Sequence, residues 1–164
     1  MAPQKNRKIV TLKKLGTVLR PLKKKGKTVV FTNGCFDIIH AGHVRYLLKA
    51  KTLGDLLIVG LNSDASVRQI KGTRRPIVSQ QERAEVLAAL ECVDYITIFD
   101  DLTPLSLIEH LEPDILVKGA DWAGHAIVGA DIVKKKGGRV ARMKLARGIS
   151  TTNIIKKILD LHNK

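Results

Sequence analysis

The clearest chemical signal in the sequence is a pair of histidines, His40 and His43, that follows an apolar run beginning at Val29. An Asn-Gly break separates the run from the histidines, and an amphipathic segment comes directly after them. Backbone N–H groups at a helix start attract phosphate, and imidazoles there stabilise charge that develops on a transferring phosphate. Gly42 leaves room for a ligand close to the backbone. The pattern predicts a phosphate-binding turn between a strand and a helix.

Other interpretations of this stretch stay open. Asp37, His40 and His43 form a two-histidine, one-carboxylate set that suits a metal ion, and histidines at this spacing are also satisfied by backbone groups. Cys35 lies near both histidines in sequence, so a thiol nucleophile competes with a packing role. The loops G-x-x-x-x-G-K-[ST] and G-x-G-x-x-G are both absent after this strand. Their absence disfavours a P-loop kinase and a dinucleotide dehydrogenase.

A second signal is a run of hydroxyl side chains, Ser150, Thr151 and Thr152, at the start of the last predicted helix. Hydroxyls beside the free N–H groups of a first helical turn suit a phosphate or an adenine contact. The alternative is that Ser150 simply caps the helix.

Two further groups of residues suit anionic and polyol ligands. The cations Lys71, Arg74, Arg75 and Arg83 are able to hold β and γ phosphates, and a solvated basic face is the alternative. At the end of a predicted strand, the run from Lys118 to Trp122 combines a cation, a glycine bend, the acid Asp121 and the only tryptophan. Asp121 suits hydroxyl groups and Trp122 suits a ring face, whereas a core tryptophan beside a capping aspartate is the competing interpretation.

Alternating apolar runs and amphipathic segments specify the elements that position these residues. The predicted strands span 27–32, 55–61, 94–99, 114–118 and 139–145, and the predicted helices span 11–25, 41–53, 79–89, 103–111, 128–136 and 151–161. Residues 62–79 are expected to be mostly loop, with one helical turn. This order predicts a three-layer, Rossmann-like α/β domain with a five-stranded parallel sheet. The polar loops follow strands, so they converge on one edge of the sheet.

Composition limits the class of protein. The chain has 164 residues and a formal net charge of +14, and ten basic residues but no acid precede Asp37. We expect a basic helical extension at 1–26 and a catalytic domain at 27–164. The basic block suits a polyanionic substrate or, as an alternative function, nucleic acid, and a solvated basic face with a loose tail is the competing interpretation. The absence of a membrane-length apolar run, a signal peptide and a metal-type or redox-type cysteine spacing predicts a cytoplasmic protein.

The motifs also carry a resemblance. The run FTNGCFDIIHAGHVRYL, followed by LNSDASVRQIKG, RPI, ERAEVLAAL, DILVKGADW and STTNIIKKI, is similar to one branch of the cytidylyltransferase-like nucleotidyltransferases. That branch is the D-glycero-β-D-manno-heptose 1-phosphate adenylyltransferases of bacterial ADP-heptose synthesis. The similarity covers roughly residues 27–158.

The resemblance implies transfer of AMP from ATP, with Mg²⁺, to heptose 1-phosphate, giving ADP-heptose and pyrophosphate for lipopolysaccharide core or surface-glycan precursors. It implies that His40, His43 and Lys71 are catalytic and that Asp37, Lys118, Asp121 and Trp122 lie on the sugar-phosphate side. The implied nucleotide-binding residues are Thr32, Asn33, Gly34, Cys35, Phe36, Gly42, Ser150, Thr151 and Thr152. A homodimer is common in the family.

The chain departs from the family pattern in three respects. The superfamily motif often ends in arginine where Lys156 stands, and lysine cannot hold phosphate in the same bidentate way. The family enzyme is commonly fused behind a sugar kinase, for which this chain has no room, so we expect a stand-alone transferase. The basic segment before Lys27 is outside the pattern. A transferase of the same fold acting on glycerol 3-phosphate, a flavin nucleotide or another alcohol phosphate, with ATP or CTP, is the nearest alternative.

Overall fold

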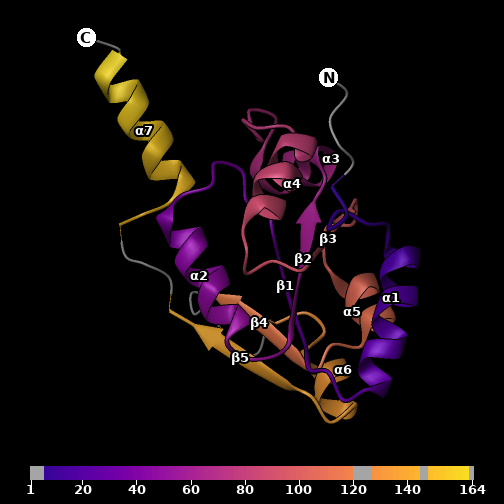
Figure 1. The fold of residues 1–164 in the computed structure, drawn as a ribbon. Helices are drawn as coiled ribbons and strands as arrows, with labels where there is room; N and C mark the ends of the chain where they lie inside the picture. The colour runs from indigo at the N-terminus through magenta and orange to yellow at the C-terminus, as the bar shows by residue number, and fades with distance from the viewer. Residues whose placement is uncertain (1–5, 120–126, 145–147, 163–164) are drawn as a thin grey trace.

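The core of the protein is a five-stranded sheet in which every pairing is parallel. A computed structural model describes residues 6–119, 127–144 and 148–162 (Figure 1). The strand order is β3-β2-β1-β4-β5. The strands are β1 Val29–Gly34, β2 Leu56–Asn62, β3 Tyr95–Phe99, β4 Ile115–Gly119 and β5 Arg139–Met143. This arrangement confirms the predicted parallel α/β sheet, and the strand order reverses between β1 and β4.

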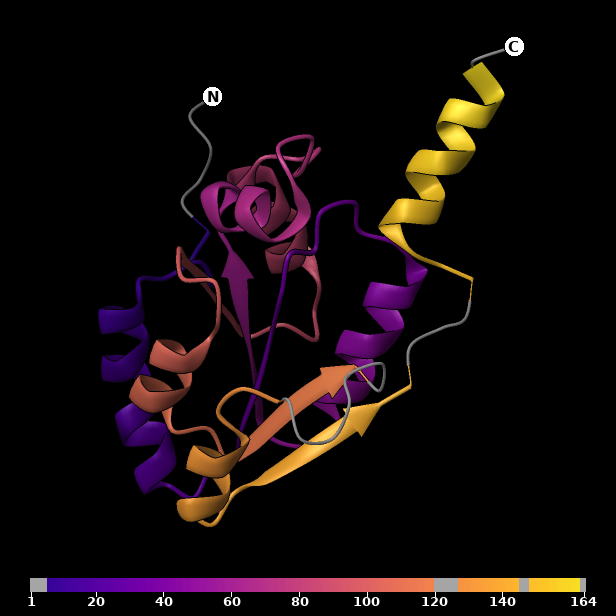
Figure 2. The same ribbon diagram turned by 180° about the vertical axis from the view of Figure 1, so that it is seen from behind.

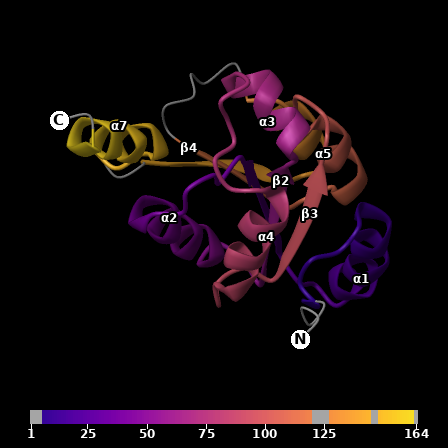
Figure 3. The same ribbon diagram turned by 90° about the horizontal axis from the view of Figure 1, so that it is seen from above.

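Helices cover both faces of the sheet and complete the predicted three layers. They are α1 Leu12–Lys24, α2 Ala41–Lys51, α3 Asp64–Lys71, α4 Gln80–Ala89, α5 Leu105–Leu111, α6 Ala130–Lys135 and α7 Thr151–His162. One apolar cluster joins α2 and α4 to the sheet, and a second joins α1, α5 and α6 to the opposite face (Figure 3). Alternate residues of each strand enter different clusters: Val30 faces α2, whereas Phe31 faces α5.

The structure differs from the sequence-based expectation after β2 and before α5. Residues 64–71 form a full helix, α3, rather than a single turn, because Ser63 caps it by accepting a hydrogen bond from the N–H of Ser66. The helix expected at 103–111 begins two residues later, at Leu105. Pro104, rather than Thr103, is its N-cap, and no side chain caps it.

The basic N-terminal segment packs against the sheet domain. Leu15 and Leu19 of α1 are buried in the cluster that contains α5, and Ile9 forms a parallel bridge with Ile96 of β3. Some of its lysines serve as caps: Lys23 donates to the carbonyl oxygen of Leu111, 2.8 Å away at the end of α5. The proposed domain boundary after residue 26 stays a prediction.

The last helix, α7, projects away from the rest of the molecule (Figures 1 and 2). Thr151 at its start is its only residue classed as buried, and apolar side chains further along, such as Ile158 and Leu161, are exposed. Of the helices in the described part of the chain, none combines the length and the apolar character that crossing a bilayer requires.

Candidate active site

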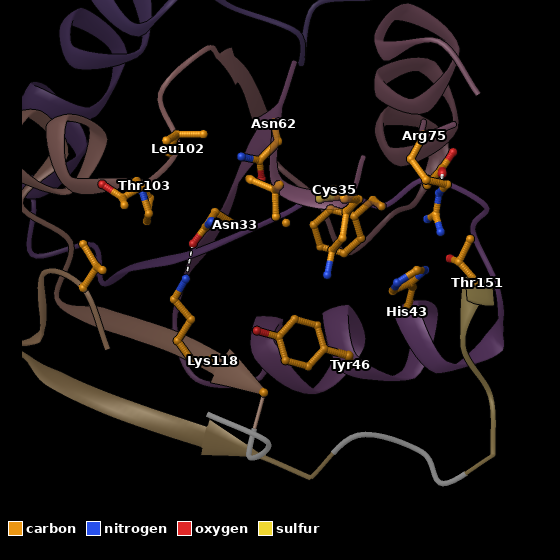
Figure 4. A pocket seen from close by; sticks show the side chains of 18 of the residues that line it. Asn33, Cys35, His43, Tyr46, Asn62, Arg75, Leu102, Thr103, Lys118 and Thr151 are labelled. Atoms are coloured by element: carbon orange, nitrogen blue, oxygen red, sulfur yellow. Dashed lines mark hydrogen bonds and ion pairs between the residues drawn. The ribbon is translucent and has the colours of Figure 1, made fainter. Parts of the chain in front are cut away.

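A cavity of about 440 Å³ opens at the carboxyl ends of the strands, where the strand order reverses between β1 and β4. In open parallel sheets this crevice is the usual ligand site. Figure 4 shows Lys118, Asn33 and Thr103 toward one end of the cavity and His43, Arg75 and Thr151 toward the other. Its lining consists of Asn33, Gly34, Cys35, Phe36, Asp37, His43, Tyr46, Asn62, Ile70, Lys71, Arg75, Leu102, Thr103, Pro104, Lys118, Gly119, Ile127, Val128, Thr151 and Thr152.

The two histidines meet at the start of α2. His40 is the N-cap, and its Nδ1 accepts a hydrogen bond from the backbone N–H of His43 at 3.3 Å. The imidazole rings stack with centroids 3.8 Å apart, and the ring of Phe36 packs edge-on against His43 at 5.2 Å. The predicted phosphate-binding turn therefore has a defined geometry in which capping of the helix fixes the ring of His40.

The electrostatics of this pair favour neutral rings. Burial, with a smaller contribution from the neighbouring His40, lowers the pKa of His43 to about 4. Burial also lowers the pKa of His40. Nδ1 of His43 is buried and has no hydrogen-bond partner among the described residues. A buried polar atom without a partner is unusual and is found at catalytic sites.

Gly42 makes room for His40. A Cβ atom at position 42 would lie 2.9 Å from Nδ1 and 3.0 Å from Cε1 of the His40 ring. Real Cβ atoms essentially never approach other atoms at under 3.0 Å. The glycine between the histidines is thus required for the position of the first imidazole, an explanation that the sequence alone did not provide.

Asp37, predicted to contact substrate, instead connects two segments of the protein. Its Oδ1 accepts hydrogen bonds from the N–H groups of Ile77 and Val78 at 2.8 and 2.9 Å. Its Oδ2 accepts from Nε of Arg75 at 2.5 Å and from Ile77 at 3.0 Å. Three N–H donors thus engage both oxygens of the carboxylate, with the Ile77 N–H shared between them. Although it lines the cavity, it positions the segment that carries Arg75.

The same contacts disfavour the metal interpretation of the histidine turn. The guanidinium of Arg75 pairs with the charge of Asp37, and backbone N–H groups hold its carboxylate in place. Across the described ranges, no group of three or more His, Cys, Asp or Glu side chains is placed to hold a metal ion.

Arg83, considered above as a phosphate ligand, is fully buried and acts as a cross-link. Its guanidinium donates to Asp64 at 2.7 Å, to the carbonyl of Val78 at 3.0 Å and to the carbonyl of Cys35. The residue after Cys35, Phe36, has a φ of 43°, a left-handed conformation that costs about 1–2 kcal/mol for a residue with a side chain. Arg83 therefore helps to fix the strained turn that leads to the histidines.

At the other end of the cavity, Lys118 of β4 donates a hydrogen bond to Oδ1 of Asn33 of β1. Burial lowers the pKa of Lys118 to about 8. No ion pair of Lys118 exists within the described residues. A half-buried cation without a carboxylate partner loses hydration, so an anionic ligand at this position would be bound favourably.

The start of α7 brings the hydroxyl run to the cavity. Thr151 is buried and donates a hydrogen bond to the carbonyl of Ile38 at 3.3 Å, which joins α7 to the histidine turn. Thr152 lines the cavity and is exposed. Ser150 caps the helix by accepting from the N–H of Asn153 at 3.1 Å, and it is not part of the cavity lining.

The structure brings most of the predicted site residues together. Lys71 at the end of α3 lines the cavity with the Asn33–Phe36 segment. Thr32, next to Asn33 in β1, is fully buried, and its hydroxyl shares a hydrogen bond of 2.7 Å with the hydroxyl of Tyr46. Asp121 and Trp122, expected to clasp a polyol, lie outside the described residues.

The sequence analysis missed several lining residues, including Tyr46, Asn62 and Thr103. Asn62 ends β2 as Asn33 ends the neighbouring strand, so the rule that polar residues at strand ends converge would have identified it. Tyr46 follows His43 by three residues and so shares a helix face with it. Thr103 was expected to begin a helix, whereas the structure places it in the loop before α5.

Comparisons with known proteins agree with this geometry. The model of the cytidylyltransferase-like family matches residues 31–157. The chain is 57% identical to the bifunctional protein HldE of Syntrophotalea carbinolica over 96% of this chain and 32% of that protein. It is also 57% identical to HldE of Campylobacter concisus over 93% of this chain and 32% of that one. The chain thus spans about a third of the length of these curated relatives.

Among solved structures, the lipopolysaccharide core biosynthesis protein of Thermoplasma volcanium is similar, with a TM-score of 0.61 and 27% identity. The match covers 74% of this chain and 98% of that one. Pantoate-beta-alanine ligase from Francisella tularensis, at 14% identity and a TM-score of 0.55, shares the fold over 95% of this chain and 79% of that one. With the family model matched over most of its length and the histidine turn lining the cavity, the chain belongs to the cytidylyltransferase-like family.

Proposed function

We propose that this chain is a nucleotidyltransferase that moves AMP from ATP to D-glycero-β-D-manno-heptose 1-phosphate, releasing pyrophosphate. The observation that carries the proposal is that His43, at the start of α2, lines the same cavity as Thr151 and Thr152, at the start of α7. Two helix N-termini and neutral imidazole donors suit a polyphosphate. The motifs shared with heptose 1-phosphate adenylyltransferases and the similarity to HldE support the choice of acceptor.

In the proposed reaction, an oxygen of the acceptor phosphate attacks the α-phosphorus of ATP. A new P–O bond forms there while the bond to the oxygen that bridges to the β-phosphorus breaks, and pyrophosphate leaves with that electron pair. A phosphate oxygen is already a nucleophile, so no protein nucleophile is needed. Catalysis then consists of positioning the two phosphates and stabilising charge on the transferring one.

The residues have distinct parts in this reaction. His40 and His43 stabilise the α-phosphate, and Lys71 and the hydroxyl groups of Thr151 and Thr152 bind the phosphates that leave. Cys35, which also lines the cavity, has a pKa raised mainly by burial, so its thiol stays protonated and contributes packing rather than nucleophilic attack. Bound together with ATP, Mg²⁺ would neutralise part of the charge on the phosphates.

The test is a pyrophosphate-release assay in which ATP and CTP are each combined with heptose 1-phosphate, glycerol 3-phosphate and a flavin mononucleotide. We expect turnover with ATP and heptose 1-phosphate and at least about tenfold lower kcat/KM for every other pair. Activity on another pair, with none on ATP and heptose 1-phosphate, would overturn the proposal. Binding of ATP without pyrophosphate release from any pair would indicate a nucleotide-sensing protein instead.

We further propose that the protein is a homodimer and acts in the cytoplasm, where ATP is made. The dimer is supported by the family resemblance and by the exposed Ile158, Leu159 and Leu161 of α7. A helix of twelve residues with one buried side chain gains little stability by itself, so cover by a second chain is favourable. Sedimentation equilibrium tests the proposal, and a monomer at all concentrations up to about 100 μM contradicts it.

A further inference from the structure

Asn62, at the end of β2, presents a hydrogen-bond acceptor to the cavity. Its Nδ2 donates to Oγ of Ser66 at 2.9 Å, and that Oγ donates to the carbonyl of Asp101 at 2.9 Å. A hydroxyl has one proton, and a carbonyl only accepts, so Ser66 must accept from Asn62. The chain of bonds therefore fixes the orientation of the amide. Oδ1 of Asn62 is left without a hydrogen bond to any described residue, and the side chain lines the cavity.

Asn33, at the end of β1, presents the opposite group. The ammonium of Lys118 only donates, so the atom that it contacts must be the amide oxygen, Oδ1. The amide nitrogen, Nδ2 of Asn33, then has no hydrogen bond to the described residues. Lys118 itself uses one N–H on Asn33, and its remaining donors have no protein partner within the described residues.

These three side chains lie on one face of the sheet. Asn33 is in register with Gly60, two residues before Asn62, so both asparagines point to the face that α5 covers. Phe31 is in register with Leu116, which puts Lys118 on that face as well. His43 and Tyr46 reach the cavity from α2, on the opposite face. Asn33, Asn62 and Lys118 form what we call the amide corner.

The amide corner has the chemistry of a phosphorylated polyol site. It offers one oriented acceptor, one oriented donor and a cation that burial deprives of hydration, whereas sugar hydroxyls both donate and accept. The lowered pKa of Lys118, about 8, reflects that burial, and a bound anion would raise this pKa by stabilising the ammonium. An apolar acceptor would leave all three groups without partners, at a cost of about 1–3 kcal/mol for each.

We propose that the amide corner binds the phosphorylated sugar, with Oδ1 of Asn62 accepting from one hydroxyl, Nδ2 of Asn33 donating to another, and Lys118 contacting the attacking phosphate. The inference rests on the proposed function, because it assigns the acceptor side of that reaction. It leaves the α2 and α7 side of the cavity to ATP. This proposal assigns the side chain of Asn33 to acceptor binding, whereas the family resemblance implied that Asn33 binds the nucleotide.

The test compares Michaelis constants for the two substrates in Asn62→Ala and Lys118→Met, with heptose 1-phosphate and Mg-ATP as the probes. Each variant is expected to raise the KM for the sugar phosphate at least about tenfold and to change the KM for ATP less than about twofold. Ser66→Ala frees the amide of Asn62 without touching the ligand, and we expect a smaller rise, about threefold, in the same constant. Asn6→Ala, an amide deletion away from the cavity, is the matched control and leaves both constants unchanged.

The outcomes separate this inference from the proposed function. If the wild-type chain releases pyrophosphate and the variants raise the KM for ATP instead, or neither constant, the amide corner is not the acceptor site although the function stands. A wild-type chain that neither binds nor turns over any sugar phosphate overturns both. If Asn62→Ala does not fold, Asn62→Ser keeps a hydroxyl next to Ser66, and the same tenfold criterion applies to it.

Discussion

Nδ1 of His40 accepts a hydrogen bond from the backbone N–H of His43 at 3.3 Å, and the two imidazole rings stack with centroids 3.8 Å apart. One contact thus caps α2 and fixes the ring that supports His43. Because burial keeps both rings neutral near pH 7, each offers a single N–H donor rather than a positive charge. Stabilisation of the α-phosphate in the proposed reaction is then directional, like that of an oxyanion hole.

His43→Ala tests the role of the second imidazole. Loss of one oriented donor to the transferring phosphate is expected to lower kcat by about 10² or more while the fold is retained. Steady-state pyrophosphate release gives kcat, and thermal unfolding monitors the fold. His162→Ala, at the exposed end of α7, is the control and is expected to turn over normally. Near-normal turnover of His43→Ala would refute the assigned role.

Gly42→Ala tests the close approach between the backbone and His40. The added methyl group would lie 2.9 Å from Nδ1 of His40, so we expect the ring of His40 to shift and its stack with His43 to be disturbed. We expect kcat to fall at least about tenfold, by analogy with the misplacement of a catalytic group, with little change in the far-ultraviolet spectrum. Ala41→Gly perturbs the same helical turn without adding an atom. This control is expected to lower the free energy of unfolding by about 1 kcal/mol and to change kcat little. Equal losses of kcat in Gly42→Ala and Ala41→Gly would contradict the steric explanation.

Asp37→Asn tests the link between the histidine turn and the segment that carries Arg75. Burial by itself would raise the pKa of Asp37, but the N–H groups of Val78 and Ile77 and the guanidinium of Arg75 together lower it. A carboxyl with a lowered folded pKa contributes stability above its unfolded pKa, about 3.9, and loses that contribution as the pH falls through the folded value. The wild type is therefore expected to lose stability below about pH 4, and the variant is expected to show a flatter dependence.

At neutral pH the same variant is expected to unfold about 1–3 kcal/mol more easily, because its amide nitrogen would face Nε of Arg75, a second donor. Urea unfolding at several pH values measures both effects. Asp160→Asn, on an exposed position of α7, is the matched control. An unchanged urea midpoint for Asp37→Asn at every pH would show that the contacts of Asp37 contribute nothing.

The pKa of Lys118 predicts how affinity for the acceptor depends on pH. Burial lowers that pKa to about 8, and only the protonated form attracts phosphate. The KM for the sugar phosphate is expected to rise as the pH increases through about 8. In Lys118→Met the dependence of this KM on pH is expected to be weaker. The second pKa of a phosphate monoester is about 6, so the substrate keeps one charge state over this range. A KM for the sugar phosphate that is flat in the wild type would contradict the prediction.

The sequence predicted the fold well because the signals for it are local. Apolar runs and capping patterns lie within a few residues of each other, as in β2 and in the capping box of Ser79 and Glu82. The helix α3 was underestimated because charged and polar residues interrupt its apolar face, and its cap, Ser63, alone marks its start.

The candidate site was predicted less completely, because its contacts join distant segments. The sequence shows that an aspartate, Asp37, precedes the histidines. It does not show that Asp37 bonds to Arg75, which lies 38 residues further along the chain. The buried position of Arg83 depends on partners from three separate segments, and arginine is otherwise a surface residue. Lys118 was identified because topology, rather than side-chain contact, brings strand ends to one edge, whereas Asn33 was named through the family resemblance.

The reversal of strand order between β1 and β4 means that substrate selectivity can be engineered one half at a time. The histidines stand on α2, whereas Asn62 and Lys118 stand on the ends of β2 and β4, packed beneath α5. On the proposed division of the cavity, libraries of variants confined to those two strand ends are expected to change the acceptor while the phosphate-transfer chemistry stays in place.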